Sequence, residues 1–203
     1  KIFSSSNPDS ICIPNFAIKN VIYINPNKIE YVNSIPIKFN NSTKFILDFD
    51  WDKTNRNLNP DFDHPTFITC FELFVEGKKI EKCSNYFYFK NQIMKNKIYK
   101  NCKNHDDIIN FLSKKIELFK SIKKLGIKKN YLFNIQFMID KNFNLVKINS
   151  GNHRMAISRI LKIKKIPVEI KVIHSECFSN NLNNKVNLKE INKFIKNIEE
   201  KYA

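Results

Sequence analysis

The chain has 203 residues, of which 42% are apolar and 13% aromatic, and this is enough material for one substantial hydrophobic core. Its apolar runs are far shorter than the roughly 20 residues that a membrane-spanning helix requires, and its first residues contain no apolar signal core. We therefore expect a cytoplasmic protein without a membrane span. Five scattered cysteines without a Cys-x-x-Cys pair argue against a disulfide framework and against a zinc knuckle.

The net charge of +16 suggests partners rich in phosphate, such as nucleic acids. Only three of the 35 basic residues are arginines, however, and the chain is rich in Lys, Asn and Ile, which AT-rich codons encode. Much of the charge can therefore reflect genome composition, and nucleic-acid binding is kept as an alternative. Two of the three arginines and one of the three glycines lie between Gly151 and Arg159, which makes this segment informative.

The predicted elements, in chain order, are a strand at 21–24, strand or loop over 34–59, helices at 65–76, 84–95 and 105–125, strands at 132–139 and 144–148, a helix at 152–162, a strand at 167–173 and a helix at 188–201. Asn104 is suited to cap the third helix, which Gly126 ends, and Asn187 with Glu190 predicts a capping box for the last helix. We expect a single α/β (α+β) domain over residues 1–203. It would consist of a small mixed sheet with packed helices and a helical insertion at about 60–128.

The polar segment 149–154, Asn-Ser-Gly-Asn-His-Arg, lies between a predicted strand and a predicted helix. A helix start offers unpaired backbone N–H groups and the positive end of the helix dipole, and both attract an anion such as phosphate. A glycine at position 151 lets the main chain approach a ligand closely, and the planar guanidinium of Arg154 can grip two phosphate oxygens. The alternative interpretation is an ordinary polar turn with a helix cap. The residues predicted to bind the nucleotide in this segment are Ser150, Gly151, Asn152, His153 and Arg154.

Acidic residues at alternate positions form a second candidate group. Alternate side chains of an extended chain share a face, so Asp48, Asp50 and Asp52 would project together. Asp50 and Asp52 could then hold Mg²⁺ against nucleotide phosphates, or one could act as general base toward an acceptor hydroxyl. The alternative is a solvated acidic loop.

Two histidines complete the candidate set. His153, within the polar segment, could donate a hydrogen bond or shuttle a proton, so it joins Asp50 and Asp52 as a candidate catalytic residue. His174 follows the last predicted strand and could face the same cleft, although an ordinary histidine at a strand end explains its position equally well.

Two segments of the chain resemble the ParB/sulfiredoxin-like superfamily. Residues 145–170 combine a strand, a Gly-x-His-Arg turn, an Ala-containing helix and Ile-Pro-Val leading into a strand, and residues 21–29 are similar to the superfamily's opening strand and turn. In that superfamily the turn corresponding to residues 151–154 holds nucleotide phosphates. Its members include partition proteins that bind CTP and DNA, sulfiredoxins that use ATP, and ADP-dependent free serine kinases. The Asp-Trp-Asp element at 50–52, the helix end at 121–126 and His174 resemble uncharacterised ParB-like proteins associated with surface-glycan gene clusters.

Departures from these families narrow the function. Position 152 is Asn where a sulfiredoxin has its nucleophilic Cys, and about 30 residues after Ile173 are too few for the DNA reader and dimerisation tail of a partition protein. The catalytic Glu of the serine kinases has no clear match, although Glu30 lies nearby. The resemblance implies a phosphotransferase that uses ATP or ADP, or CTP, with Mg²⁺ to phosphorylate a small acceptor such as an amino acid or sugar. The alternatives are a nucleic-acid-binding protein or nuclease, and a nucleotide-sensing module without turnover.

Overall fold

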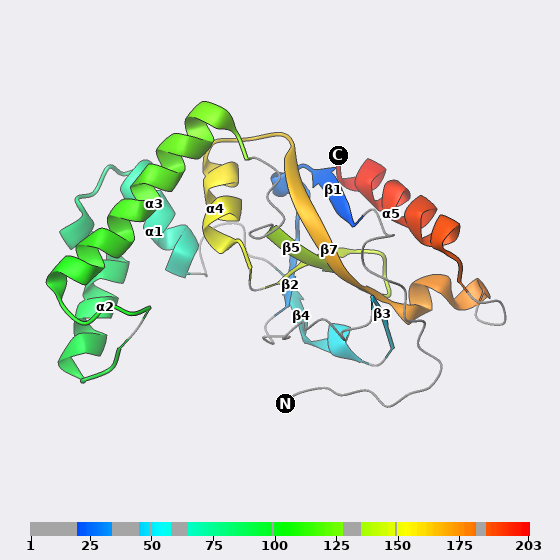
Figure 1. Ribbon diagram of the computed structural model, residues 1–203, viewed down its shortest axis with the longest axis horizontal. Helices are drawn as coiled ribbons and strands as arrows, with labels where there is room; N and C mark the ends of the chain where they lie inside the picture. The colour runs from blue at the N-terminus through cyan, green and yellow to red at the C-terminus, as the bar shows by residue number, and fades with distance from the viewer. Residues whose placement is uncertain are drawn as a thin grey trace. The chain divides into compact units, whose positions relative to one another are not determined.

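The computed structural model describes residues 20–33, 45–48, 50–57, 65–98, 100–127, 135–148, 150–181 and 186–203. The chain divides into a sheet unit, residues 1–58, 129–151 and 164–203, and a helical unit, residues 59–128 and 152–163 (Figure 1). The mixed α/β class predicted from the sequence is confirmed. The helical unit contains the segment predicted as an insertion and also the helix that begins within the polar segment 149–154.

The sheet unit is built on a mixed sheet, which has seven strands in the described part of the chain. The strands are β1 (Val21–Ile24), β2 (Tyr31–Asn33), β3 (Ile46–Leu47), β4 (Asn55–Asn57), β5 (Ile135–Ile139), β6 (Leu145–Lys147) and β7 (Ile166–His174). Their order is β1-β7-β5-β6-β2-β4, and β3 pairs with β7 beyond the end of β1. β5 and β7 are parallel, whereas β5 and β6 form the predicted antiparallel hairpin.

β7 is an interior strand of this sheet, paired with β1 and β3 along one edge and with β5 along the other, and most of its residues are apolar. Every residue except Lys171 is buried, as expected for a strand covered on both faces. Met138, Val172 and Ile148 form a cluster with Trp51, so the centre of the sheet packs against the short segment that carries the predicted acids.

Helix α5 (Leu188–Tyr202) is capped at its start and tied to the sheet unit near its end. The predicted capping box is present, since the Asn187 and Glu190 side chains and backbone amides bond reciprocally. Near the other end the buried Tyr202 hydroxyl accepts a hydrogen bond of 3.1 Å from the Leu145 amide of β6, and the Tyr202 carbonyl accepts one of 2.7 Å from the Asn25 amide. Figure 1 shows α5 beside β1.

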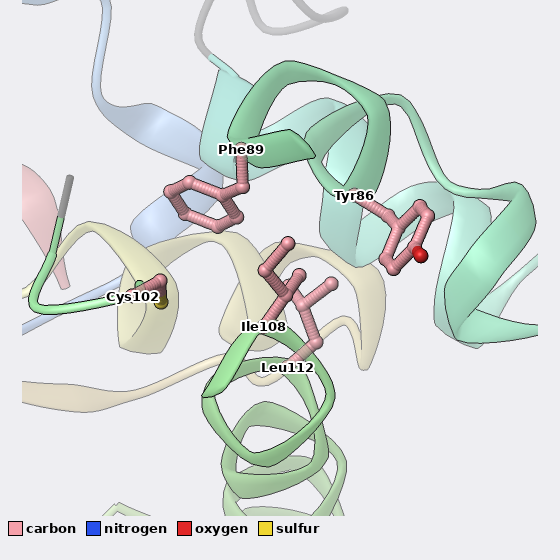
Figure 2. Packing of buried hydrophobic residues seen from close by; sticks show 5 residues of the cluster. All are labelled: Tyr86, Phe89, Cys102, Ile108 and Leu112. Atoms are coloured by element: carbon pink, nitrogen blue, oxygen red, sulfur yellow. The ribbon is translucent and has the colours of Figure 1, made fainter. Parts of the chain in front are cut away.

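The helical unit contains α1 (Pro65–Phe74), α2 (Ser84–Met94), α3 (His105–Leu125) and α4 (Asn152–Ile160). Tyr86 and Phe89 of α2 point toward Ile108 and Leu112 of α3 in a buried cluster with Cys102 (Figure 2). Asn104 caps α3 by accepting a hydrogen bond from the Asp107 amide, and Gly126 ends it, as predicted.

A carboxylate from α1 fixes the start of α2. Glu72 is buried and accepts hydrogen bonds of 2.8 Å and 2.7 Å from the Ser84 amide and hydroxyl, and one of 3.0 Å from Lys78. Burial raises the pKa of Glu72, but these hydrogen bonds outweigh burial and hold the pKa below its ordinary value. An anion at a helix N-terminus is favoured by the helix dipole, so Glu72 locks α1 to α2.

One local prediction is wrong. The segment with Asp50 and Asp52 is not extended, because residues Trp51–Thr54 form a 3-10 helix. The other 3-10 helices of the described residues are Pro26–Lys28, Ile80–Lys82 and Ser175–Asn181. Within the described ranges, no helix has the length and apolar character needed to span a membrane.

Candidate functional site

The predicted strand, turn and helix around position 151 are present in the order that the sequence indicates. β6 ends at Lys147 and α4 begins at Asn152. Asn149 lies outside the described residues. Residues 150–154 are all partly exposed, and α4 has no acidic side chain in its first turn. The Ser150 amide is already engaged, since it donates a 2.7 Å hydrogen bond to the Ile148 carbonyl. An anion at this turn would therefore contact the backbone amides from Gly151 onward.

Gly151 is required by the backbone itself. Its φ is +74°, in the region that favours glycine, and a Cβ built there would lie 2.9 Å from the Cα of Ile135. The close backbone approach expected at this glycine exists, but on the Cβ side its partner is strand β5. The glycine is therefore explained by packing within the sheet unit, whether or not a ligand binds.

Lys147 contacts the turn that precedes α4, and it is not among the site residues predicted from the sequence. It is 3% exposed, and its ammonium group donates to the carbonyl oxygens of Ile148 and Ser150. Burial lowers the pKa of Lys147 to about 7, because a charged amine loses its hydration in the interior. A lysine within the apolar strand Leu145–Lys147 is the only signal in the sequence, and in a chain so rich in lysine it is inconspicuous.

His153 and Arg154 occupy the first turn of α4. The imidazole of His153 meets the Phe111 ring of α3 edge to face, with the ring centroids 6.4 Å apart. The Arg154 carbonyl accepts a 2.6 Å hydrogen bond from the Ser158 hydroxyl, which holds the helix backbone at this point. Partial burial lowers the pKa of Arg154, but an arginine remains charged near neutral pH. The first turn of α4 therefore carries the positive charge of Arg154 at neutral pH.

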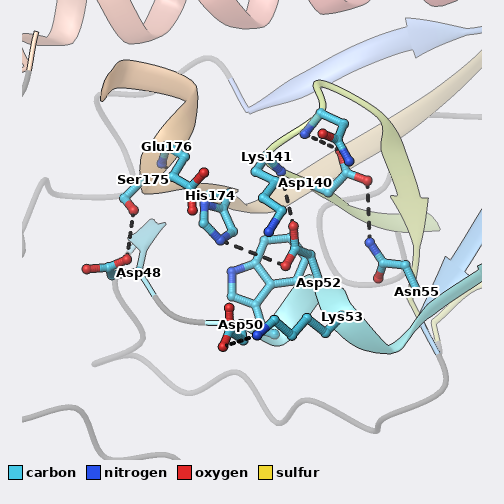
Figure 3. A network of polar contacts seen from close by, with 12 residues as sticks. Asp48, Asp50, Asp52, Lys53, Asn55, Asp140, Lys141, His174, Ser175 and Glu176 are labelled. Carbon is cyan, nitrogen blue, oxygen red and sulfur yellow. Dashed lines mark hydrogen bonds and ion pairs between the residues drawn. The ribbon is translucent and has the colours of Figure 1, made fainter. Parts of the chain in front are cut away.

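The predicted acids do not share a face, because the chain turns into the 3-10 helix at Trp51. Asp50 is exposed and accepts a 2.6 Å ion-pair contact from Lys53, whereas the Asp52 side chain is 4% exposed (Figure 3). Asp48 accepts a 3.1 Å hydrogen bond from the Ser175 hydroxyl. Each carboxylate therefore has a different environment and a different partner.

Asp52 and His174 come together in the interior of the sheet unit. His174 Nδ1 accepts a 3.2 Å hydrogen bond from the Glu176 amide, so a neutral imidazole carries its hydrogen on Nε2. Nε2 lies 4.0 Å from Asp52 Oδ1, an atom with no hydrogen-bond partner among the described residues, and the His174 ring lies 5.6 Å from that of Trp51 (Figure 3). His174 is 2% exposed, so its side chain lies within this buried network and does not face an open cleft.

Asp140, which the sequence indicated only as part of a turn, organises the same end of the sheet. Its Oδ1 accepts hydrogen bonds of 3.0 Å and 2.8 Å from the Asn142 and Asn144 amides, and its carbonyl accepts one of 3.2 Å from the Cys177 thiol. Burial, followed by the nearby carboxylate of Asp140, raises the pKa of Cys177 to about 12. Cys177 is therefore a packed thiol without nucleophilic character at neutral pH.

The metal site predicted at Asp50 and Asp52 does not fit these side chains. One carboxylate is bound to Lys53 at the surface, and the other is buried beside His174. In the part of the chain that the structure describes, no three His, Cys, Asp or Glu side chains are grouped so that they could hold a metal ion.

No protein-family model, curated protein or solved structure matches this chain. The resemblance to the ParB/sulfiredoxin-like superfamily therefore stays a prediction, based on residues 21–29 and 145–170.

Proposed function

We propose that the protein binds a nucleoside di- or triphosphate at the start of α4 and transfers a phosphoryl group to a small acceptor such as an amino acid or sugar. One observation carries the proposal: a glycine with positive φ is followed directly by a helix whose partly exposed first turn contains Arg154 and no acidic side chain. Such a helix start attracts phosphate through its backbone N–H groups and its dipole. The resemblance to nucleotide-binding families supports the same assignment.

Arg154 has the central role in binding. Its planar guanidinium can form two parallel hydrogen bonds with phosphate oxygens, and its partial burial strengthens them. Lys147 adds charge close to the turn, because its ammonium group is bonded to the Ser150 carbonyl. An anion nearby would favour the protonated amine of Lys147. Nucleotide binding near pH 7 should therefore be accompanied by proton uptake.

In the transfer step, an acceptor hydroxyl oxygen forms a bond to the terminal phosphorus of the nucleotide. The bond from that phosphorus to the bridging oxygen breaks, and the shortened nucleotide leaves with the bonding electrons. The hydroxyl proton passes to a base, for which His153 in the partly exposed first turn of α4 is the candidate. Mg²⁺ would arrive on the nucleotide phosphates, as it commonly does, rather than at Asp50 and Asp52.

Asp52 and His174 have a structural role in this proposal, since both are buried within the sheet unit. The cytoplasm, where nucleotides are abundant, is the proposed location.

Binding is tested by isothermal titration calorimetry with ATP, ADP and CTP, with and without Mg²⁺. We expect saturable binding that Arg154→Ala reduces at least tenfold, because a charge-assisted contact contributes about 1.5–3 kcal/mol. Lys164→Ala is the matched control: it removes one exposed cation just beyond α4 and should leave binding unchanged. Equal losses in both variants, or no binding to the wild type, would refute the proposal.

Turnover is tested separately, because a sensor would bind without reacting. ³¹P NMR of the protein with Mg²⁺-nucleotide and a panel of amino acids and sugars should show an acceptor-dependent phosphomonoester signal. His153→Gln should slow its formation without abolishing binding. Binding without any such signal would favour the sensing module.

A further inference from the structure

The exposed face of α2 and the residues on either side of it combine lysines with exposed aromatic side chains. Between positions 82 and 105 the sequence contains no Asp or Glu. It contains six lysines, all exposed: Lys82, Lys90, Lys95, Lys97, Lys100 and Lys103. None of the ion pairs formed by the described residues involves Lys90, Lys95 or Lys97. The part of the segment around Lys90, Lys95 and Lys97 therefore presents a positive charge that no ion pair of the described residues neutralises.

Large apolar side chains stand among these lysines. Phe87 is 52% exposed, Tyr88 46%, Met94 73% and Ile98 64%. Tyr86 and Phe89 fill the opposite face of α2, which packs on α3 (Figure 2), whereas the four apolar side chains of this second set remain largely exposed to solvent. Phe87 and Met94 are seven residues apart and share one face, about 10 Å apart along the helix axis.

We infer that this face of α2 binds single-stranded nucleic acid. Unpaired bases stack on exposed aromatic rings, while lysines spaced along the same surface follow the phosphates. A length of about 10 Å matches about three nucleotides at the spacing of one strand of a duplex. The inference is independent of the proposed nucleotide site at α4.

The polar residues on this face favour a nucleic acid over an anionic membrane. Asn91 lies between Phe87 and Met94 on the helix surface, and Ser84 lies one turn before Phe87. A helix that inserts into lipid has a continuous apolar face, and burying the Asn91 amide there would cost hydrogen bonds. Beside a nucleic acid the same amide can bond with base edges.

The test is fluorescence anisotropy of the full chain with a fluorescein-labelled oligothymidylate of about 16 nucleotides. Phe87→Ala with Tyr88→Ala should weaken binding about tenfold or more, because stacking platforms are lost. Both side chains are exposed, so the fold should survive, which circular dichroism verifies. Phe143→Ala removes a 45% exposed aromatic ring of the sheet unit and should have no effect.

Charge is tested with a matched pair of double variants. Lys90→Ala with Lys95→Ala should lower the slope of log affinity against log salt by about 1.4, that is about 0.7 for each lost phosphate contact. Lys189→Ala with Lys193→Ala removes the same charge from exposed positions of α5 and should leave the slope unchanged.

Three outcomes would overturn the inference: equal loss in the two lysine pairs, wild-type affinity in the aromatic variant, or binding to phosphatidylserine vesicles but not to the oligonucleotide.

Discussion

Replacing Gly151 by alanine separates a structural from a ligand-binding role for this glycine. The new Cβ would lie 2.9 Å from both the Cα and the Cγ1 of Ile135, and the Cα belongs to a strand that is paired on both edges. The backbone would also have to keep a φ of +74° with a side chain present. Two costs therefore add at one position.

The magnitude follows from a comparison with another glycine. Gly126 has a φ of +69°, but a Cβ added there would meet no atom within 4 Å, so Gly126→Ala carries only the conformational cost of about 1 kcal/mol. Gly151→Ala carries that cost and an overlap of about 1–3 kcal/mol, so we expect about 3 kcal/mol in total. For a chain of this length these values correspond to falls in Tm of about 3 °C and about 9 °C.

The assay is thermal unfolding followed by circular dichroism in buffer without nucleotide. If Gly151 served only the approach of a ligand, the two variants would unfold at similar temperatures. Equal Tm values would therefore refute the packing argument. A larger fall for Gly151→Ala would confirm it and leave nucleotide binding to be decided by Arg154.

Three further substitutions test particular contacts of the fold. Glu72→Gln removes the charge that accepts two hydrogen bonds from Ser84, so we expect a loss of about 2 kcal/mol at pH 7. The pKa of Glu72 is lower in the folded protein than in the unfolded chain. Its contribution to the free energy of unfolding is therefore present above the pKa of the unfolded carboxyl group and is lost as the pH falls through the pKa of the folded state. Tyr202→Phe leaves the buried Leu145 amide without its acceptor and should cost about 1–3 kcal/mol in urea unfolding. Burial lowers the pKa of Lys147 to about 7, so above pH 7 its amine binds fewer protons in the folded state than in the unfolded state. The free energy of unfolding of the wild type should therefore rise relative to that of Lys147→Met by about 2 kcal/mol between pH 7 and pH 9.

Matched controls accompany these variants. Glu81→Gln removes an exposed carboxylate of the helical unit, and Tyr23→Phe removes a hydroxyl from a residue that is 39% exposed. Neither should change the free energy of unfolding by more than about 0.5 kcal/mol. A pH-independent difference between Lys147→Met and the wild type would contradict the lowered pKa of Lys147.

Local sequence determined the elements because their signals act over a few residues. The Asn104 cap and the Gly126 stop define α3, and the Asn187 capping box defines the start of α5. Each of these signals concerns backbone groups within one helical turn, so no distant contact was needed to interpret it. The order of strand, turn and helix around Gly151 was predicted for the same reason.

Tertiary structure alone decided the environments of the charged groups. The alternating acids were expected on one face, but packing of Trp51 against Met138 and Val172 places Asp52 in the interior beside His174, while Asp50 stays in solvent. Likewise, only the sheet order buries Lys147 in β6. The chemistry of an ionisable group depends on its burial and on the distance to its partners. Both are set by residues far apart in the chain. A local sequence pattern could therefore identify the candidate residues but could not assign their roles.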